Sequence, residues 1–331
     1  MLDLNQPENA FLLSVTREAS ALAQQVKAGM AMMNLTKSDF SPVTVGDYAI
    51  QALVARRLEE QLGGPALVGE ERAEALRAPE QGEMRQVVAE FVGKFCAGAT
   101  EDTVCEWIDR GAAEPAGVYW ILDPIDGTKG YVRGGQYAVA LARIAEGQVT
   151  HAALGCPNLP VSALPEMGEG AVALAQRDAG AYISPLDQDE FHHLQVSTYS
   201  DPSDARFLRS YESSHTNAGQ IDEVAARMGT VAEPVRMDSQ AKFAVLAAGR
   251  GDVLFRLLSA DRPDYKECAW DLAAGSLVLE EAGGRITDLS GKPLDFTAGR
   301  RLTNNRGVVA SNGVLHESAL EALAAVGAAS A

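Results

Sequence analysis

The sequence predicts a layered α/β fold with two lobes. Residues 8–33 place apolar side chains at helical spacing, which predicts one long amphipathic helix. Strand-like runs follow in the middle of the chain, at residues 118–122, 137–144 and 149–154. Because the second half alternates the two kinds of element, we expect helices and sheets to stack in layers.

The remaining elements are predicted from the same patterns. A helix is expected to begin at Thr44, and a short buried strand and a further helix to follow at residues 67–69 and 81–96, the latter before a polar connection. Later strands are expected at residues 171–175, 207–210 and 253–257, and later helices at residues 220–228, 239–248 and 270–282 and beyond His316. We expect the lobes to divide near residue 157, into residues 1–157 and residues 158–331.

Composition narrows the possible partners. The 331 residues carry a formal charge of −17, which argues against a nucleic-acid polymer, because binding its phosphates requires a basic surface. A small anionic substrate stays possible, since a few cations can dominate the field inside a cleft. No segment approaches the roughly 20 apolar residues that cross a membrane, and the N-terminus has no basic start followed by an apolar stretch. We therefore expect no membrane partner and no export, and both a monomer and a homodimer stay open.

The cysteines favour a reducing compartment. The chain has four of them, Cys96, Cys105, Cys156 and Cys268, with neither a C-x-x-C pair nor zinc-ligand spacing. We interpret them as buried or incidental thiols. A cytoplasmic protein is the expectation.

The most informative motif is an apolar strand that ends in a tight acidic loop. Asp123 and Asp126 lie three residues apart, and Pro124 and Gly127 make the backbone turn there. Both carboxylates can therefore converge on one hard cation, with the carbonyl of Ile125 as a further oxygen ligand. The loop predicts a metal site.

Other acidic side chains stand at the ends of predicted elements. Glu70 and Glu71 follow a strand, and Asp271 opens a helix, in positions where sites are commonly built. Each also has an ordinary explanation, because an aspartate before a helix is often a cap and paired glutamates are often solvated. Asp47, three residues after Thr44, fits a capping box as well as a catalytic role.

Taken together, these blocks resemble one family, the magnesium-dependent, lithium-sensitive phosphatases that include inositol monophosphatases and 3'(2'),5'-bisphosphate nucleotidases. The similar blocks are residues 41–47, 69–71, 123–128 and 270–275, in the same order and spacing over nearly the whole chain. The nucleotidase branch is the more similar, because it shares three further blocks, residues 127–134, 155–159 and 237–243.

The resemblance implies an inositol monophosphatase-like fold and a phosphoric monoester hydrolase. The implied reaction removes the 3'-phosphate of adenosine 3',5'-bisphosphate to give AMP and phosphate, by metal-activated water and without a covalent intermediate. The resemblance also implies two or three Mg²⁺ ions, inhibition by Li⁺ and a role in sulfur assimilation. Three alternatives stay open: an inositol or other sugar phosphate as substrate, 3'-phosphoadenosine 5'-phosphosulfate as substrate, and a silent nucleotide sensor.

The resemblance further implies roles for individual residues. The implied metal ligands are Glu70, Asp123, the Ile125 carbonyl, Asp126 and Asp271. The implied catalytic residues are Asp47 and Thr128, which orient and deprotonate the water, with help from Glu70. The implied substrate contacts are the amides of Gly127 and Thr128 and the side chains of His215, Ser239, Lys242 and Arg256. Residues 1–157 would then carry most metal ligands, and residues 158–331 would carry Asp271 and the nucleotide contacts.

The nucleotide contacts have a partial basis in the sequence itself. Ser239 and Lys242 lie three apart on a predicted helix and can share a face, although a solvated helix face is the alternative for Lys242. Two departures from the nucleotidase pattern bear on selectivity. Cys268 stands where a lysine usually follows the glutamate, which removes a cation beside the metal site, and Leu272 stands where many relatives have histidine.

Overall fold

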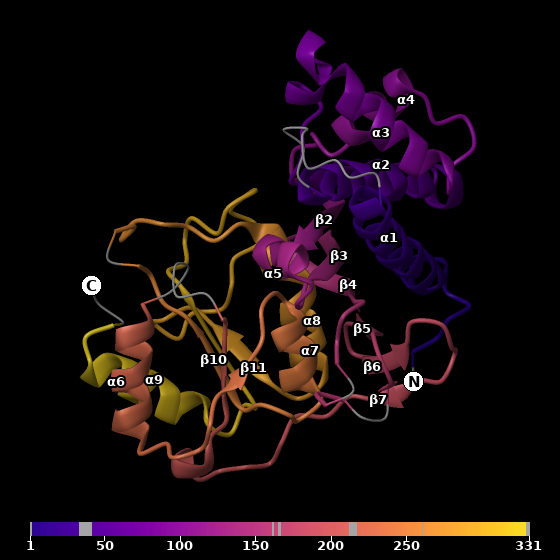
Figure 1. The fold of residues 1–331 in the computed structure, drawn as a ribbon. Coiled ribbons are helices and arrows are strands. Elements are labelled where there is room, and N and C mark those ends of the chain that lie inside the picture. Colours follow the sequence, from indigo (N-terminus) through magenta and orange to yellow (C-terminus); the bar gives the residue numbers. More distant parts are fainter. Residues whose placement is uncertain are drawn as a thin grey trace.

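A computed structural model describes residues 2–32, 42–160, 162–164, 167–211, 217–259 and 261–328. The chain forms five layers, in which helices and sheets alternate (Figure 1). Two helices cover one face of a seven-stranded sheet, a second pair separates this sheet from a five-stranded sheet, and a third pair covers the outer face of the latter. The predicted layered α/β fold is confirmed.

The first layer is built from α1 (Pro7–Met32) and α2 (Pro42–Leu62). Both pack on the large sheet through apolar faces, because their buried side chains recur at helical spacing. Two shorter helices, α3 (Gly82–Gly93) and α4 (Glu101–Asp109), cover the far side of α2.

The seven-stranded sheet follows the chain in strand order. Its strands are β1 (Leu67–Gly69), β2 (Val118–Asp126), β3 (Ala138–Ala145), β4 (Gln148–Cys156), β5 (Ala171–Gln176), β6 (Gly180–Pro185) and β7 (His192–His193). Only the β1–β2 pair within this described sheet is parallel. Successive residues of β2 face opposite layers, so Trp120 packs against α1 and Tyr119 against the middle layer.

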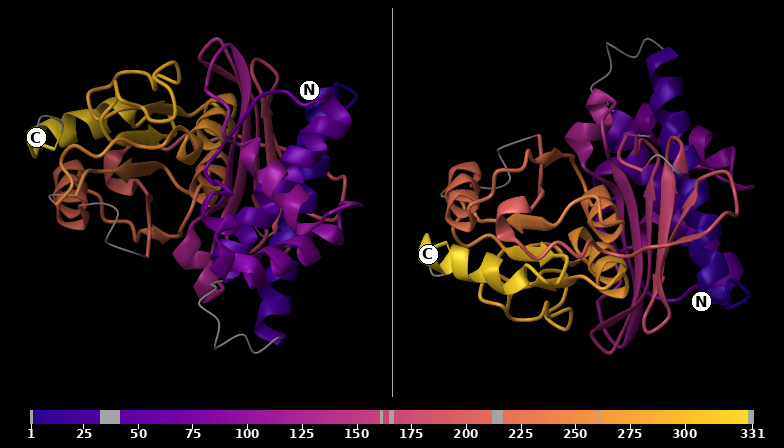
Figure 2. Two further views of the ribbon diagram at one scale, coloured as in Figure 1. Left: turned by 90° about the horizontal axis from the view of Figure 1, so that it is seen from above. Right: turned by 90° about the horizontal axis from the view of Figure 1, so that it is seen from below.

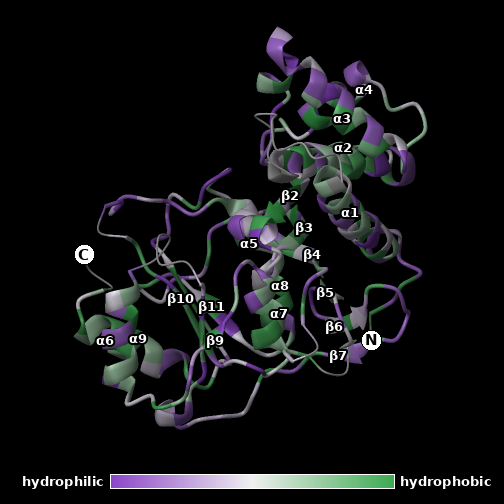
Figure 3. Ribbon diagram, in the orientation of Figure 1, coloured by the Kyte–Doolittle hydropathy of each residue, from purple (hydrophilic) through white to green (hydrophobic). Residues whose placement is uncertain are grey.

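The middle layer consists of α7 (Ala241–Ala247) and α8 (Ala273–Glu281), covered on both sides by sheets (Figure 2). Alanines dominate the sheet face toward α8, which lets helix and sheet approach closely. The two helices also approach each other at Gly275, where an added Cβ would lie 2.3 Å from the Phe243 ring. Figure 3 shows hydrophobic residues along both helices, as a layer covered on two sides requires.

The five-stranded sheet has the order β11-β12-β10-β8-β9. Its strands are β8 (Phe207–Arg209), β9 (Val235–Arg236), β10 (Val253–Arg256), β11 (Arg285–Thr287) and β12 (Val308–Ser311). The outer helices are α6 (Ala218–Met228) and α9 (His316–Ala325). The remaining short helices are α5 (Thr128–Arg133) and the 3₁₀ turns Ala75–Arg77, Pro79–Gln81, Pro202–Asp204 and Ala269–Asp271.

Most predicted elements are confirmed, and two expectations in the N-terminal half are wrong. The polar connection after α3 is the helix α4, which begins at a capping box between Thr100 and Thr103. Thr44 does not begin a helix, because α2 already begins at Pro42 and thus includes Thr44 and Asp47. No described helix is long and apolar enough to cross a membrane.

The strand pairing around residue 157 shows where the chain passes from one sheet to the other. The expected division into residues 1–157 and 158–331 falls between β4 and β5, which pair from His151–Gln176 to Cys156–Ala171. The first sheet continues to His193 and the second begins at Phe207. The chain therefore changes sheets between these two residues.

Candidate active site

Parallel pairing of β1 and β2 brings the first two carboxylates together. Gly69 and Leu122 are the last paired residues of these two parallel strands. The next residue of each strand, Glu70 and Asp123, therefore lies beside the other. Their side chains interact, and both line a pocket of about 460 Å³. The junction between a short strand and a central strand thus fixes two predicted metal ligands.

The acidic loop is an irregularity at the end of β2. The pairing of β2 with β3 shifts register between Asp123 and Asp126, so the strand bulges at this point. As a result Asp123, Ile125 and Asp126 all line the pocket. Asp126 accepts a hydrogen bond from the backbone amide of Gln240, which ties the loop to the start of α7.

Two glycines let the acidic loop and α5 pack closely against neighbouring segments. Gly127 has a φ of 90° and sits at the start of α5, where an added Cβ would lie 2.7 Å from the Cβ of Ser239. At Gly130 an added Cβ would lie 1.9 Å from the backbone oxygen of Gln136. The turn after Asp126 thus opens directly into α5.

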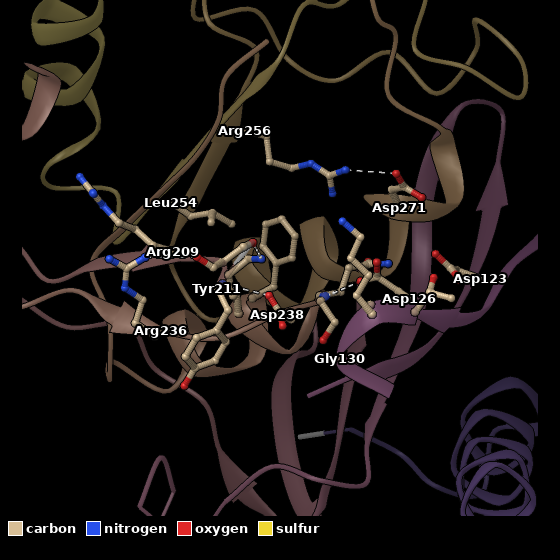
Figure 4. A pocket seen from close by; sticks show the side chains of 18 of the residues that line it. Asp123, Asp126, Gly130, Arg209, Tyr211, Arg236, Asp238, Leu254, Arg256 and Asp271 are labelled. Carbon is tan, nitrogen blue, oxygen red and sulfur yellow. Dashed lines mark hydrogen bonds and ion pairs between the residues drawn. The ribbon is translucent and has the colours of Figure 1, made fainter. Parts of the chain in front are cut away.

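Asp271 reaches the same pocket from the second half of the chain. It lies in the 3₁₀ turn Ala269–Asp271 before α8, and its Oδ2 is 3.1 Å from an Nη2 of Arg256 (Figure 4). Arg256 also lies 2.7 Å from a buried oxygen of Glu267, an ion pair without hydrogen-bond geometry. Arg256 therefore neutralises the rim of the carboxylate cluster.

Burial and mutual repulsion raise the pKa values of these carboxyl groups. Burial and the charge of Asp271 raise the pKa of Glu70 to about 7. The same two causes raise the pKa of Asp126 to about 6. Asp123 is only 3% exposed, and burial together with Glu70 raises its pKa well above the ordinary value. The cluster carries more negative charge than the surrounding protein neutralises.

The cluster fits a hard divalent cation. Within the described part of the chain, Asp123 Oδ1 is buried and has no hydrogen-bond partner, although buried polar atoms are nearly always paired. The donor set consists of oxygens, as Mg²⁺ prefers. Among the described residues, no three acidic, histidine or cysteine side chains lie close enough together to hold a metal ion as they stand. Asp126 and Asp271 instead interact with Gln240 and Arg256.

The raised pKa values predict a pH-dependent stabilisation by magnesium. Glu70 and Asp126 hold protons more tightly in the folded protein than in the unfolded chain. In EDTA, their contribution to the free energy of unfolding therefore falls as the pH rises from about 4 through their folded pKa values, about 7 for Glu70 and about 6 for Asp126. A bound cation removes this penalty and competes with protons. We expect magnesium to raise the melting temperature by a few degrees more at pH 8 than at pH 5.5, measured by calorimetry against EDTA. An equal increase at both pH values would contradict this.

The predicted catalytic residues lie beside this cluster. Asp47 is a buried residue of α2. Its burial, and to a lesser extent the negative charges of Glu71 and Glu70, raise its pKa. It does not line the pocket, whereas Thr128, at the first position of α5, does. The preceding residue, Gly46, allows the tip of Ile125 to pack against α2. Asp47 thus lies behind the acidic loop.

The predicted substrate contacts fall into two groups. Ser239, Lys242 and Arg256 line the pocket together with Gly127 and Thr128, whereas His215 lies outside the described residues. Ser239 is not on a helix as expected, because α7 begins at Ala241. It has a φ of 66°, a rare conformation for a residue other than glycine.

Lys242 is not a solvated helix residue. It is 9% exposed, and its Nζ donates a hydrogen bond of 2.9 Å to Ser210 Oγ. Burial lowers the pKa of Lys242 to about 8, although the nearby Asp126 opposes this shift. A buried cation in a pocket is typical of a site that receives an anion.

Sequence patterns missed several residues of the pocket. Arg209, Ser210 and Tyr211 come from the end of β8, Arg236 comes from β9, and Asp238 precedes Ser239. Asp238 accepts a hydrogen bond from the Tyr211 amide and pairs with Arg133 of α5 at 2.5 Å. It therefore links the two sheets at the pocket, a role that only the tertiary structure shows.

Solved structures with this fold are known. Mycobacterium tuberculosis SuhB is 22% identical with a TM-score of 0.63, and the similarity covers 97% of this chain and 96% of that chain. An IMPase from Thermotoga maritima is 18% identical with a TM-score of 0.61, covering 96% of each chain. These neighbours define the class as the inositol monophosphatase fold.

Sequence relatives define the family. The profile of the Inositol monophosphatase family matches residues 6–328. A 3'(2'),5'-bisphosphate nucleotidase from Schizosaccharomyces pombe is 38% identical, covering 96% of this chain and 95% of the relative. One from Dictyostelium discoideum is 37% identical over 87% of each chain. The chain belongs to the inositol monophosphatase family, and the resemblance inferred from its motifs is confirmed.

Proposed function

We propose that the protein is a magnesium-dependent phosphatase that removes the 3'-phosphate of adenosine 3',5'-bisphosphate and releases AMP and phosphate. One observation carries the proposal: a single pocket joins a carboxylate cluster to a buried lysine and further cations. Relatives that match nearly the whole chain are named 3'(2'),5'-bisphosphate nucleotidases, which supports this choice of substrate.

The pocket suits a substrate with two phosphates. The carboxylate end, with Asp123, Asp126 and Asp271, is the side for a phosphate that binds through metal ions, since carboxylates alone repel it. Lys242 and the arginines of the opposite wall attract a second anion directly. An inositol monophosphate carries no second phosphate for that wall.

The proposed metal ligands are Glu70, Asp123, the Ile125 carbonyl, Asp126 and Asp271. Bound magnesium ions would neutralise the phosphate, lower the pKa of water and stabilise the leaving oxygen. Their number, two or three, and inhibition by Li⁺ are part of the proposal. Arg256 lies within 3.1 Å of Asp271 and would keep this ligand oriented.

The chain's own residues would handle the water and the phosphate. The Thr128 hydroxyl, at the first position of α5, would hold the attacking water and pass its proton to Asp47. The raised pKa of Asp47 suits an acceptor of that proton. Gly127 and Thr128 line the pocket, and their backbone amides would donate to phosphate oxygens, while Glu70 would assist from the carboxylate side. The attack by water requires no covalent intermediate.

The proposed location is the cytoplasm. All four cysteines are free and buried, which supports a compartment that keeps thiols reduced.

The proposal is tested by incubating the protein with adenosine 3',5'-bisphosphate and magnesium and separating the products. We expect equimolar phosphate and AMP, with no release in EDTA. Adenosine 3'-phosphate as the product would reverse the proposed orientation in the pocket, and no release would refute the proposed activity.

A further inference from the structure

Two arginines lie side by side on the pocket wall. The strands β8 and β9 are parallel neighbours, and Arg209 and Arg236 are register partners. Both line the pocket, and Figure 4 shows them on the side away from Asp123, Asp126 and Asp271. Like charges on adjacent strands repel each other, so this arrangement costs free energy unless an anion compensates it.

The protein compensates these two cations incompletely. Arg209 pairs with the exposed Asp222 at 2.5 Å, but its Nε is buried and has no hydrogen-bond partner within the described residues. Arg236 donates to the backbone oxygen of Ser210 at 3.3 Å, and the described part of the chain places no carboxylate within ion-pair distance of it. The exposed guanidinium of Arg236 therefore keeps donors available to a ligand, while Arg209 is only partly compensated.

Ser210 connects the arginines to the buried lysine. Its backbone oxygen accepts from Arg236, and its hydroxyl accepts from Lys242 Nζ at 2.9 Å. Because the hydroxyl accepts from Lys242, its own proton is free to be donated into the pocket. Ser210 therefore lies between Arg236 and Lys242 and contacts both side chains.

Arg256 differs from these residues in its surroundings. It lies within ion-pair distance of Glu267 and Asp271, and although burial acts to lower its pKa, Glu267, Asp271 and Asp126 raise it. Its charge is already neutralised by carboxylates. It is therefore a poorer partner for the second phosphate than its place in the pocket indicates.

The geometry points to an anion subsite formed by Arg209, Ser210, Arg236 and Lys242, which holds the phosphate that is not cleaved. This inference rests on the proposed function, and it assigns selectivity for a bisphosphate over a monophosphate to the β8–β9 wall. A guanidinium recognises phosphate through a fork of donors, and a lysine adds a point charge. Arg256 then serves the carboxylate end.

Arg236→Ala tests the subsite, because Arg236 is exposed and bonds only to a backbone oxygen among its described partners. We expect kcat/KM for adenosine 3',5'-bisphosphate to fall about tenfold or more, mainly through KM, and to change less than about twofold for adenosine 3'-phosphate. Arg236→Lys should restore part of the loss. Arg285→Ala, which removes an arginine paired with Glu317 outside the pocket, is the matched control. Equal losses for both substrates would overturn the inference.

A second measurement separates this inference from the proposed activity. Hydrolysis of p-nitrophenyl phosphate is inhibited with AMP, which carries only the 5'-phosphate. We expect the inhibition constant of AMP to rise about tenfold in Arg236→Ala and to stay unchanged in Arg285→Ala. If the wild-type protein does not cleave the bisphosphate, the proposed function fails, but this inhibition still tests the subsite. An unchanged inhibition constant in Arg236→Ala would refute it.

Discussion

Asp126→Asn is expected to lower kcat by at least about a hundredfold at saturating magnesium. The substitution removes one negative charge from the carboxylate cluster while keeping the size of the side chain. Its amide oxygen can still accept the hydrogen bond from the Gln240 backbone, so the loop should keep its position. Steady-state kinetics with the proposed nucleotide measure the effect.

Although Asp126→Asn should lower turnover, it should not lower the thermal stability of the metal-free protein. Burial and Asp271 raise the pKa of Asp126 to about 6, so at pH 8 its charge opposes folding when no metal is bound. Asp126→Asn should therefore melt at the same or a higher temperature than the wild type in EDTA, and should gain less from magnesium. Asp187→Asn is the control, because it makes the same charge change at an exposed position. Wild-type turnover in Asp126→Asn would remove this residue from the metal ligands.

Gly130→Ala is expected to destabilise the protein by roughly 3 kcal/mol and to reduce turnover sharply. The new Cβ would lie 1.9 Å from the backbone oxygen of Gln136 and 3.4 Å from the Asp238 Cβ. Backbone cannot move aside as a flexible side chain can, so α5 must shift. That shift moves Thr128 relative to the carboxylate cluster. Thermal unfolding and kinetics at saturating magnesium measure both effects.

Gly93→Ala provides the matched control. Gly93 ends α3, its φ is not positive, and an added Cβ would meet only the Ala99 Cβ at 3.9 Å. Alanine there should be neutral or slightly stabilising, by at most about 1 kcal/mol, with unchanged turnover. If Gly130→Ala behaves like Gly93→Ala, the close packing of α5 against Gln136 does not hold the site in place.

Local patterns in the sequence predicted the elements and the acidic loop because both depend on neighbouring residues. The apolar run before Asp123 marks β2, and the short run before Glu70 marks β1. The sequence patterns did not predict α4, because the third position of its capping box is Thr103 and not the glutamate or glutamine that usually marks such a box.

Contacts across the sheets lie beyond such patterns. Pairing of β8 with β9 brings Arg209 next to Arg236, although the two residues lie on separate strands of only three and two residues. The position of Asp238, between Tyr211 and Arg133, depends on how the two sheets meet. Ser239 lies in a strained turn before α7. Its spacing of three residues from Lys242 is also that of a helix, so the sequence predicted a helix at Ser239.

The departure at Cys268 also has a structural context. Cys268 is buried before the 3₁₀ turn that carries Asp271, and burial raises the pKa of its thiol to about 12. A neutral thiol therefore stands where many nucleotidases are expected to have a lysine. Arg256, paired with Glu267 and Asp271, supplies positive charge on this side of the pocket.

The most direct test of the proposed function compares kcat/KM for adenosine 3',5'-bisphosphate and inositol 1-phosphate under the same magnesium concentration. A preference for the nucleotide of about a hundredfold or more, equivalent to about 3 kcal/mol in transition-state binding, is the expected result. Comparable efficiencies, or a preference for inositol 1-phosphate, would contradict a bisphosphate nucleotidase and would indicate a broader sugar phosphatase that uses the same carboxylate cluster.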